Sequence, residues 1–150
     1  MHQPTNIRPE QAAWRRRYPF GYFSSGGPDP IGPRDHIVDA RWLRDGRKVI
    51  LLRDVVFVDP DGVRWVAPCG RVVDGLSTPR VLWRIQPPFS GKAREASVIH
   101  DAACEDRVLP SWQVHRAFYF AMRANGVGWL AAWARWLSVR LFGPRFKGVT

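Results

Sequence analysis

The 150-residue sequence lacks any run of about 20 consecutive apolar residues, the length that a membrane-spanning helix requires. Its first residues, Met1–Pro4, carry neither a basic flank nor an apolar segment, so we expect no secretory signal peptide. The two cysteines, Cys69 and Cys104, match none of the usual zinc-binding spacings. These absences predict a chain without a transmembrane span and with reduced thiols in a cytoplasm, while a Cys69–Cys104 disulfide remains an alternative.

Acidic residues are scarce, because 13 Asp and Glu stand against 23 Lys and Arg and give a formal net charge of +10. A surface of this charge attracts nucleic acid, anionic lipid headgroups or an acidic protein. No known DNA- or RNA-binding motif is present, so nucleic acid ranks last among these partners. The eight tryptophans are unusually many, and several of them must be packed in a core or used at an interface.

Residues 1–35 are rich in Pro, Gly and Arg and have neither helical nor strand periodicity. We predict an extended basic and aromatic arm over 1–35 and one small α+β domain over 36–150. Arg15, Arg16 and Arg17 stand between aromatic residues in the arm. They suit either contact with nucleic acid by charge and stacking or packing against a neighbouring subunit.

The domain begins with strand patterns and continues with helical ones. The β-branched stretch Val49–Val58, a turn at Asp59–Gly62 and the alternating stretch Val63–Ala67 predict an antiparallel hairpin. A shorter strand at Ala40–Leu43 would make it a three-stranded sheet. The helical half then comprises a helix around His100 that ends by Arg107, an antiparallel helix from its cap Ser111 to Asn125, and a helix over about Val127–Phe142.

The last helix carries Trp129, Trp133 and Trp136 at spacings of a single helix face, with arginines beside them. A tryptophan stripe with basic flanks is typical of a helix lying in a membrane interface. The alternative is that the stripe covers the core or contacts another subunit.

His100 and Asp101 are adjacent in the middle of a predicted helix. Because successive helix residues point about 100° apart, the two side chains belong to different faces. His100 lines up with a packed stripe of alanines, and Asp101 lies on a wetter stripe with Ser97 and Cys104. The antiparallel pairing of the next helix brings His115 toward His100. These residues predict either a histidine satisfied in the core or a catalytic base.

The loop after the hairpin contains Asp74, Gly75, Ser77 and Thr78 within one turn. Such a loop can supply a carboxylate and carbonyl oxygens to calcium. It can equally be a helix entry, in which Ser77 is the N-cap and Pro79 the first helical residue.

These motifs together resemble a family of unknown function that is common in tailed phages and prophages. The resemblance covers about Val49 to Gly143 and is carried by these stretches: Val66–Pro68, Asp74–Pro79, Trp83, Val98–Asp101, Phe118–Met122 and Gly126–Val127. It implies a phage protein associated with the virion or its tail, with other virion subunits as partners. The implied location is the host cytoplasm during assembly and then the virion.

The same order of motifs is similar, more distantly, to the calcium-dependent phospholipase A2 group. That similarity implies that His100 is the general base, that Asp101 holds Ca²⁺, and that the loop at Asp74 and Gly75 completes the cation site. Two features depart from the pattern. Cys104 replaces an aromatic residue, and His115 stands where an orienting carboxylate is expected, so that Asp106 would have to substitute for it.

Three functions therefore follow as expectations. The first is a virion-associated protein with a phospholipase-like site, in which His100, Asp101 and His115 are the catalytic residues. The second is a metal-dependent lipid-ester hydrolase working at an anionic membrane surface. The third is a basic accessory protein that binds nucleic acid.

Overall fold

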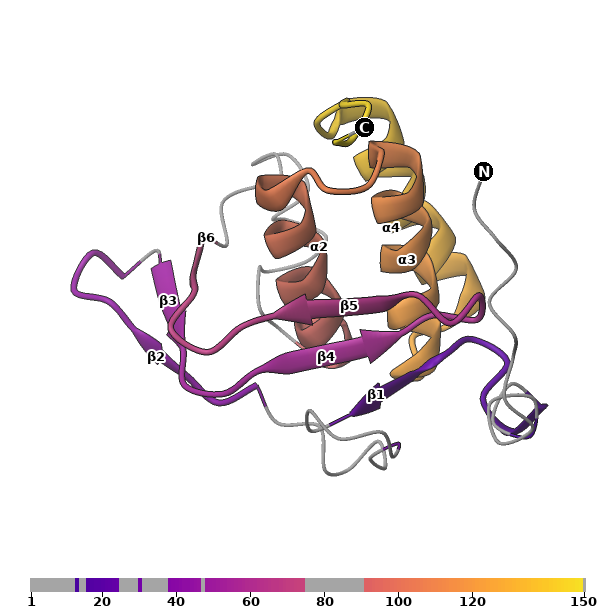
Figure 1. Ribbon diagram of the computed structural model, residues 1–150, viewed down its shortest axis with the longest axis horizontal. Coiled ribbons are helices and arrows are strands. Elements are labelled where there is room, and N and C mark those ends of the chain that lie inside the picture. The colour runs from indigo at the N-terminus through magenta and orange to yellow at the C-terminus, as the bar shows by residue number, and fades with distance from the viewer. Residues whose placement is uncertain are drawn as a thin grey trace.

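The computed structural model describes residues 13, 16–24, 30, 38–46, 48–74 and 91–149. In these residues, two small antiparallel sheets precede three α-helices, which is the predicted α+β fold (Figure 1). The strands are β1 (Tyr22–Ser24), β2 (Ala40–Trp42), β3 (Lys48–Leu51), β4 (Val55–Val58), β5 (Arg64–Ala67) and β6 (Val72–Asp74). The helices are the short 3-10 helix η3 (Gly91–Ala93), then α2 (Arg94–Asp106), α3 (Ser111–Ala124) and α4 (Trp129–Phe142).

The predicted hairpin is confirmed as β4 and β5, with Phe57 opposite Trp65. Asp59 builds its turn, because one carboxylate oxygen accepts the N–H groups of Asp61 and Val63, both at 2.9 Å. The other oxygen accepts Nε1–H of Trp65 at 3.0 Å. Gly62 closes the turn at φ 84°, a conformation that favours glycine. Strand β1 adds to the other edge of β4 to complete the sheet β1-β4-β5.

The prediction of one continuous strand over Val49–Val58 is wrong. The stretch breaks at Leu52–Asp54, and β3 joins a second sheet of order β2-β3-β6. At the break, the Asp54 carboxylate accepts the N–H of Cys69 at 2.7 Å and so ties the start of β4 to the segment after β5. The predicted short strand near residues 40–43 is confirmed as β2, but it pairs with β3 in this second sheet and does not extend the β4–β5 hairpin.

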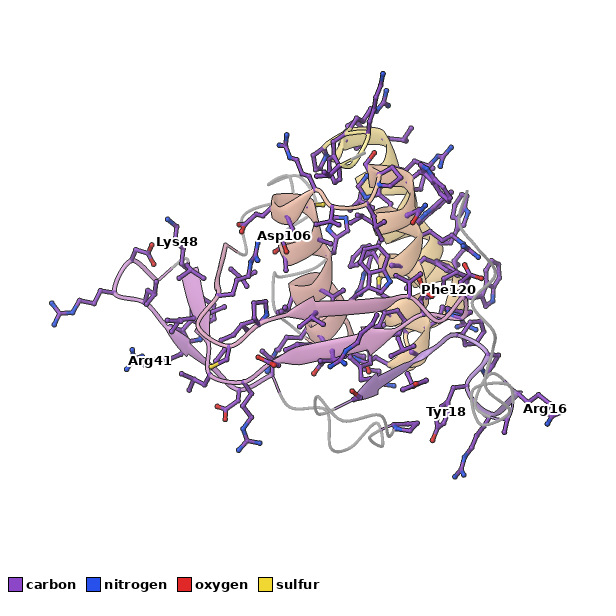
Figure 2. All side chains as sticks on the ribbon, in the orientation of Figure 1. Arg16, Tyr18, Arg41, Lys48, Asp106 and Phe120 are labelled. Carbon is purple, nitrogen blue, oxygen red and sulfur yellow. The ribbon has the colours of Figure 1, made fainter. Side chains whose placement is uncertain are left out.

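Strand β1 lies in the predicted arm but belongs to the folded domain. It pairs with β4, and Phe23 is buried against Phe57. Arg16 and Arg17 are helical and exposed, and Arg16 points away from the sheets and helices (Figure 2). Arg15 lies outside the described residues.

Helices α2 and α3 lie side by side and run in opposite directions, with the sheet β1-β4-β5 across one face and α4 behind α3 (Figure 1). Arg107 ends α2 in the left-handed conformation, at φ 51°. Ser111 was expected to cap α3, but Pro110 is the N-cap, and the Ser111 hydroxyl accepts the N–H of Phe146 instead. The main core members are fully buried apolar side chains: Phe23, Leu51, Phe57, Val73, Val98, Ile99, Val114 and Met122.

Helix α4 buries only Ala132. After it the chain folds back on α3, because the N–H of Ser111 donates to the carbonyl of Phe146 at 3.0 Å. No helix in the described part of the chain is long and apolar enough to cross a bilayer.

Candidate functional site

The predicted approach of His115 to His100 is confirmed. His100 Nε2 lies 2.9 Å from His115 Nδ1, so one imidazole donates to the other between α2 and α3. Both residues are buried, and the His100 ring packs against Phe118 with 4.7 Å between ring centres. The antiparallel helix pair thus holds two imidazoles in direct contact.

Pro144, in the segment after α4, determines which ring nitrogen of His115 carries the proton and thus which imidazole donates to the other. Its carbonyl oxygen only accepts hydrogen bonds, and it lies 3.2 Å from His115 Nε2. His115 therefore carries its proton on Nε2, and its Nδ1 accepts the Nε2–H of His100. In this arrangement Nδ1 of His100 holds a lone pair.

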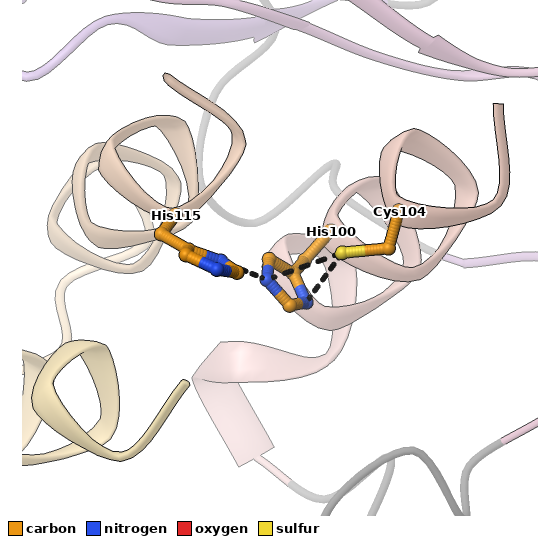
Figure 3. A group of neighbouring side chains, drawn as sticks. All are labelled: His100, Cys104 and His115. Atoms are coloured by element: carbon orange, nitrogen blue, oxygen red, sulfur yellow. Dashed lines mark hydrogen bonds between the residues drawn. The ribbon is translucent and has the colours of Figure 1, made fainter. Parts of the chain in front are cut away.

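Cys104 is the third member of the cluster; it was expected on the stripe of Asp101, but its Sγ contacts the ring of His100. It follows His100 by four residues and so lies on the same side of α2. Its Sγ is 3.6 Å from His100 Nε2. One donor atom from each of His100, Cys104 and His115 lies within 4.8 Å of the other two (Figure 3). Both thiols of the chain are free, in agreement with the predicted reduced state.

Asp101 approaches the lone-pair side of His100. Its Oδ1 is 3.8 Å from His100 Nδ1, and its side chain is 14 % exposed against 9 % for His100. This is too long for a direct hydrogen bond.

Burial shifts the acid–base properties of two cluster members. Burial, and then the neighbouring His100, lowers the pKa of His115 to about 4. Burial, and then the Asp101 carboxylate, raises the pKa of the Cys104 thiol to about 12. Near neutral pH His115 is therefore a neutral imidazole and Cys104 a protonated thiol, which argues against a cysteine nucleophile activated by His100.

Asp106, the predicted substitute for the orienting carboxylate, is engaged elsewhere. It accepts Nη2–H of Arg71 at 2.8 Å, and Glu105 accepts from the same nitrogen at 3.0 Å. The partner of His100 Nε2 is His115, so an imidazole occupies the orienting position.

The donor set of this cluster does not fit calcium. Ca²⁺ takes six to eight oxygen ligands, whereas the cluster offers two nitrogens and one sulfur. Of the predicted calcium ligands, Asp101 lies beside the cluster, Asp74 is described only as the last residue of β6, and Gly75 lies outside the described residues. Calcium binding therefore stays a prediction.

The predicted tryptophan surface lies on α4. Trp129 is 65 % exposed, Trp133 is 48 % exposed and Trp136 is half-buried, with Arg140 stacked on the Trp136 ring at 5.3 Å. The most exposed large apolar side chains of this helix are Trp129, Leu130, Trp133, Leu141 and Phe142, which we call the α4 apolar surface.

Comparison with known proteins finds a family and relatives of undefined activity. Residues 49–139 match the family described as "Protein of unknown function (DUF1353)". The uncharacterized protein y4jT of Sinorhizobium fredii strain NGR234 is 43 % identical over 128 residues, which cover 83 % of this chain and 35 % of y4jT. The uncharacterized protein y4iH of the same strain is 36 % identical over 108 residues, 68 % of this chain and 43 % of y4iH. The chain thus spans less than half the length of these relatives. No solved structure matches it.

Proposed function

The chain belongs to the DUF1353 family of proteins of unknown function, and this membership assigns no activity. We therefore infer a function from the His100 site itself and propose that this site hydrolyses esters. His100 would take a proton from a water molecule that attacks the ester carbonyl, as in the phospholipase A2 group that the sequence resembles. Asp101 would hold that water against the imidazole.

One observation carries this proposal, which is the order of hydrogen bonds from Pro144 through His115 to His100. Because each imidazole donates from Nε2, Nδ1 of His100 is left as an acceptor, with the Sγ of the Cys104 thiol 3.9 Å away. A general base needs such a lone pair within reach of the water that it deprotonates. Nδ1 of His100 and Oδ1 of Asp101 lie 3.8 Å apart, so a water placed beside the two atoms, and not between them, would contact both.

The imidazole in the orienting position predicts a slow enzyme. A neutral His115 holds the ring of His100 in place, but it stabilises the protonated base less than a carboxylate would. The nearby carboxylate is Asp101, on the other side of the ring.

The proposed substrate is an ester of an anionic lipid. The net charge of +10 favours an anionic surface, and the α4 apolar surface offers aromatic side chains that suit the interface of a bilayer.

Fatty-acid release from phosphatidylglycerol vesicles tests the proposal on the full chain, with and without added Ca²⁺. We expect release by the unchanged protein and a loss of about 100-fold or more in His100→Asn. Asp101→Asn should lose most of the activity, while Asp106→Asn, which removes the equivalent group from a carboxylate bound to Arg71, should stay within about twofold. No release in any divalent ion, or equal release by His100→Asn, would overturn it.

We propose a second role as a phage or prophage protein that associates with virion subunits. The α4 apolar surface favours this role, because exposed apolar side chains on one helix suit burial against another protein. Purified virions from a host carrying the gene should contain the protein, and Trp133→Ser should reduce its incorporation. A monomer absent from virions would contradict this role.

A further inference from the structure

We propose that His100, Cys104 and His115 form a binding site for a borderline or soft transition-metal ion, with Zn²⁺ as the type case. Two imidazole nitrogens and one thiolate are the ligand types that such ions prefer. The site differs from the calcium site implied by the resemblance, both in its residues and in the chemistry of its ion.

Two of the three separations between the donor atoms are close to those of a tetrahedral zinc site. A thiolate and an imidazole on one zinc ion lie about 3.5 Å apart, and two imidazole nitrogens about 3.3 Å. Here Cys104 Sγ is 3.6 Å from His100 Nε2, and His100 Nε2 is 2.9 Å from His115 Nδ1. Binding therefore requires the two rings to separate by a few tenths of an ångström, and requires Cys104 Sγ, which is within 4.8 Å of the His115 donor atom, to lie about 3.5 Å from it.

The backbone positions suit a site that is already assembled. His100 and Cys104 stand one helical turn apart on α2, and His115 faces them from α3 (Figure 3). Three protein ligands leave one position for water or another small ligand, as in catalytic zinc sites.

The groups around the cluster fit the protonation that a metal requires. The Pro144 carbonyl already holds the proton of His115 on Nε2, so Nδ1 has a lone pair directed into the cluster. When His100 Nε2 binds the metal, its proton moves to Nδ1, where Asp101 Oδ1 is 3.8 Å away and can accept it after a small approach. A carboxylate behind a metal-bound histidine is a common arrangement in metalloproteins.

The proton balance is simple. Both histidines stay neutral, because the His100 proton is transferred within the ring from Nε2 to Nδ1. The Cys104 thiol loses its proton to solvent as the metal–sulfur bond forms, since the ligand is the thiolate. Each bound ion therefore releases one proton.

Metal binding also has a consequence for hydrolysis, and this part rests on the proposed function. With a proton on Nδ1 and a metal on Nε2, His100 has no lone pair left to act as a base. Zn²⁺ should therefore inhibit ester hydrolysis at one ion per chain. The binding itself does not depend on any activity.

The test uses Co²⁺ as an optical probe on the reduced, metal-free full chain, followed by displacement with Zn²⁺. We expect one ion per chain, visible bands of tetrahedral Co²⁺, and a near-ultraviolet band from the thiolate–Co²⁺ bond. Cys104→Ser should abolish the thiolate band, whereas Cys69→Ser, which changes the exposed cysteine, should keep it. His115→Gln should weaken Co²⁺ binding more than 100-fold, and Asp101→Asn by about 10-fold to 100-fold, as for other outer-shell partners.

Circular dichroism of each variant separates lost binding from lost folding, and Cys104→Ala serves as a second variant if Cys104→Ser unfolds. Absence of the thiolate band in the unchanged protein would overturn the proposal, as would its survival in folded Cys104→Ser. Calorimetry in buffers of different ionisation enthalpy should give one released proton per ion. If Co²⁺ binds but vesicles are not hydrolysed, the metal site stands and the hydrolase proposal fails.

Discussion

Helices α3 and α4 have the same length of 14 residues but opposite relations to the core. The buried residues of α3 form a stripe that includes Val114, Phe118 and Met122, whereas α4 buries only Ala132. The apolar residues of α3 follow the helical period, while those of α4 extend almost all round the helix. The contrast shows that apolar content alone does not determine whether a helix is buried in the core. It also shows that α4 has an apolar surface that the described part of the chain does not cover.

The largest effect should come from removing a core side chain of α3. Met122→Ala should lower the free energy of unfolding by about 2–5 kcal/mol, because Met122 is fully buried and its loss leaves a cavity. The matched change on α4, Leu130→Ala, should stay within about 0.5 kcal/mol, since Leu130 is 60 % exposed. Urea denaturation measures both, and equal losses would remove the distinction between the helices.

Measuring the free energy of unfolding as a function of pH tests the buried side of α3, where His115 lies. Its pKa is lowered from 6.5 to about 4 by burial, so the unfolded chain binds a proton that the folded chain does not between these values. Above pH 6.5 this shift costs the folded protein no stability, because His115 is neutral in both states. As the pH falls from 6.5 toward 4, the unfolded chain takes up the proton and the free energy of unfolding decreases by up to about 3 kcal/mol. His115→Gln should remove this part of the pH dependence in metal-free buffer. A variant curve parallel to that of the unchanged protein would contradict the expectation.

A smaller effect is expected at the end of α2, where charge rather than burial holds the helix. Arg71 donates to the carbonyl of Ala102 and to the carboxylates of Glu105 and Asp106. Arg71→Ala should cost about 1 kcal/mol, because this cation also offsets the negative end of the helix dipole. Arg53→Ala, which breaks the more exposed pair with Asp39, should cost close to nothing. Thermal unfolding of the two variants gives the comparison.

The smallest change in stability should follow from altering the α4 apolar surface. Trp129→Ser combined with Trp133→Ser should shift the free energy of unfolding by less than about 1 kcal/mol, because Trp129 is 65 % exposed, Trp133 is about half exposed and neither belongs to the core. The same variant should bind anionic vesicles more weakly, as measured by cosedimentation. A loss of several kcal/mol would mean that the two side chains support the fold.

Local patterns predicted the elements whose signals lie within a few residues. The turn residues at Asp59–Gly62 predicted the hairpin, and the helical period with Asn125–Gly126 predicted the limits of α3. The break between β3 and β4 was missed, because Val49–Val58 is apolar on both sides of Arg53 and Asp54. An apolar run has no alternation of apolar and polar residues that would show where one strand ends and the next begins. The carboxylate bond from Asp54 to the Cys69 backbone spans 15 residues and leaves no local pattern.

The candidate site was predicted in part. The pairing of His100 with His115 followed from two antiparallel helices and a short link, and the structure confirms it. Cys104 was missed although its spacing of four residues from His100 was visible, because the familiar zinc patterns are sought along the sequence and not across a helix pair. The role of the Pro144 carbonyl could not be predicted from the sequence. Every residue has a backbone carbonyl, so residue type does not show which one the segment after α4 brings to His115.

The acceptor behind His115 is a main-chain oxygen, which gives the site an unusual tolerance to genetic change. Replacing the side chain at position 144 leaves a carbonyl there, so a scan of single substitutions would pass over this atom without revealing its part. Among diverging homologues, the proton on His115 would stay on the same nitrogen as long as the returning tail keeps its path. Incorporating an ester in place of the peptide bond after Pro144, which weakens that carbonyl as an acceptor, would probe what ordinary mutagenesis cannot reach.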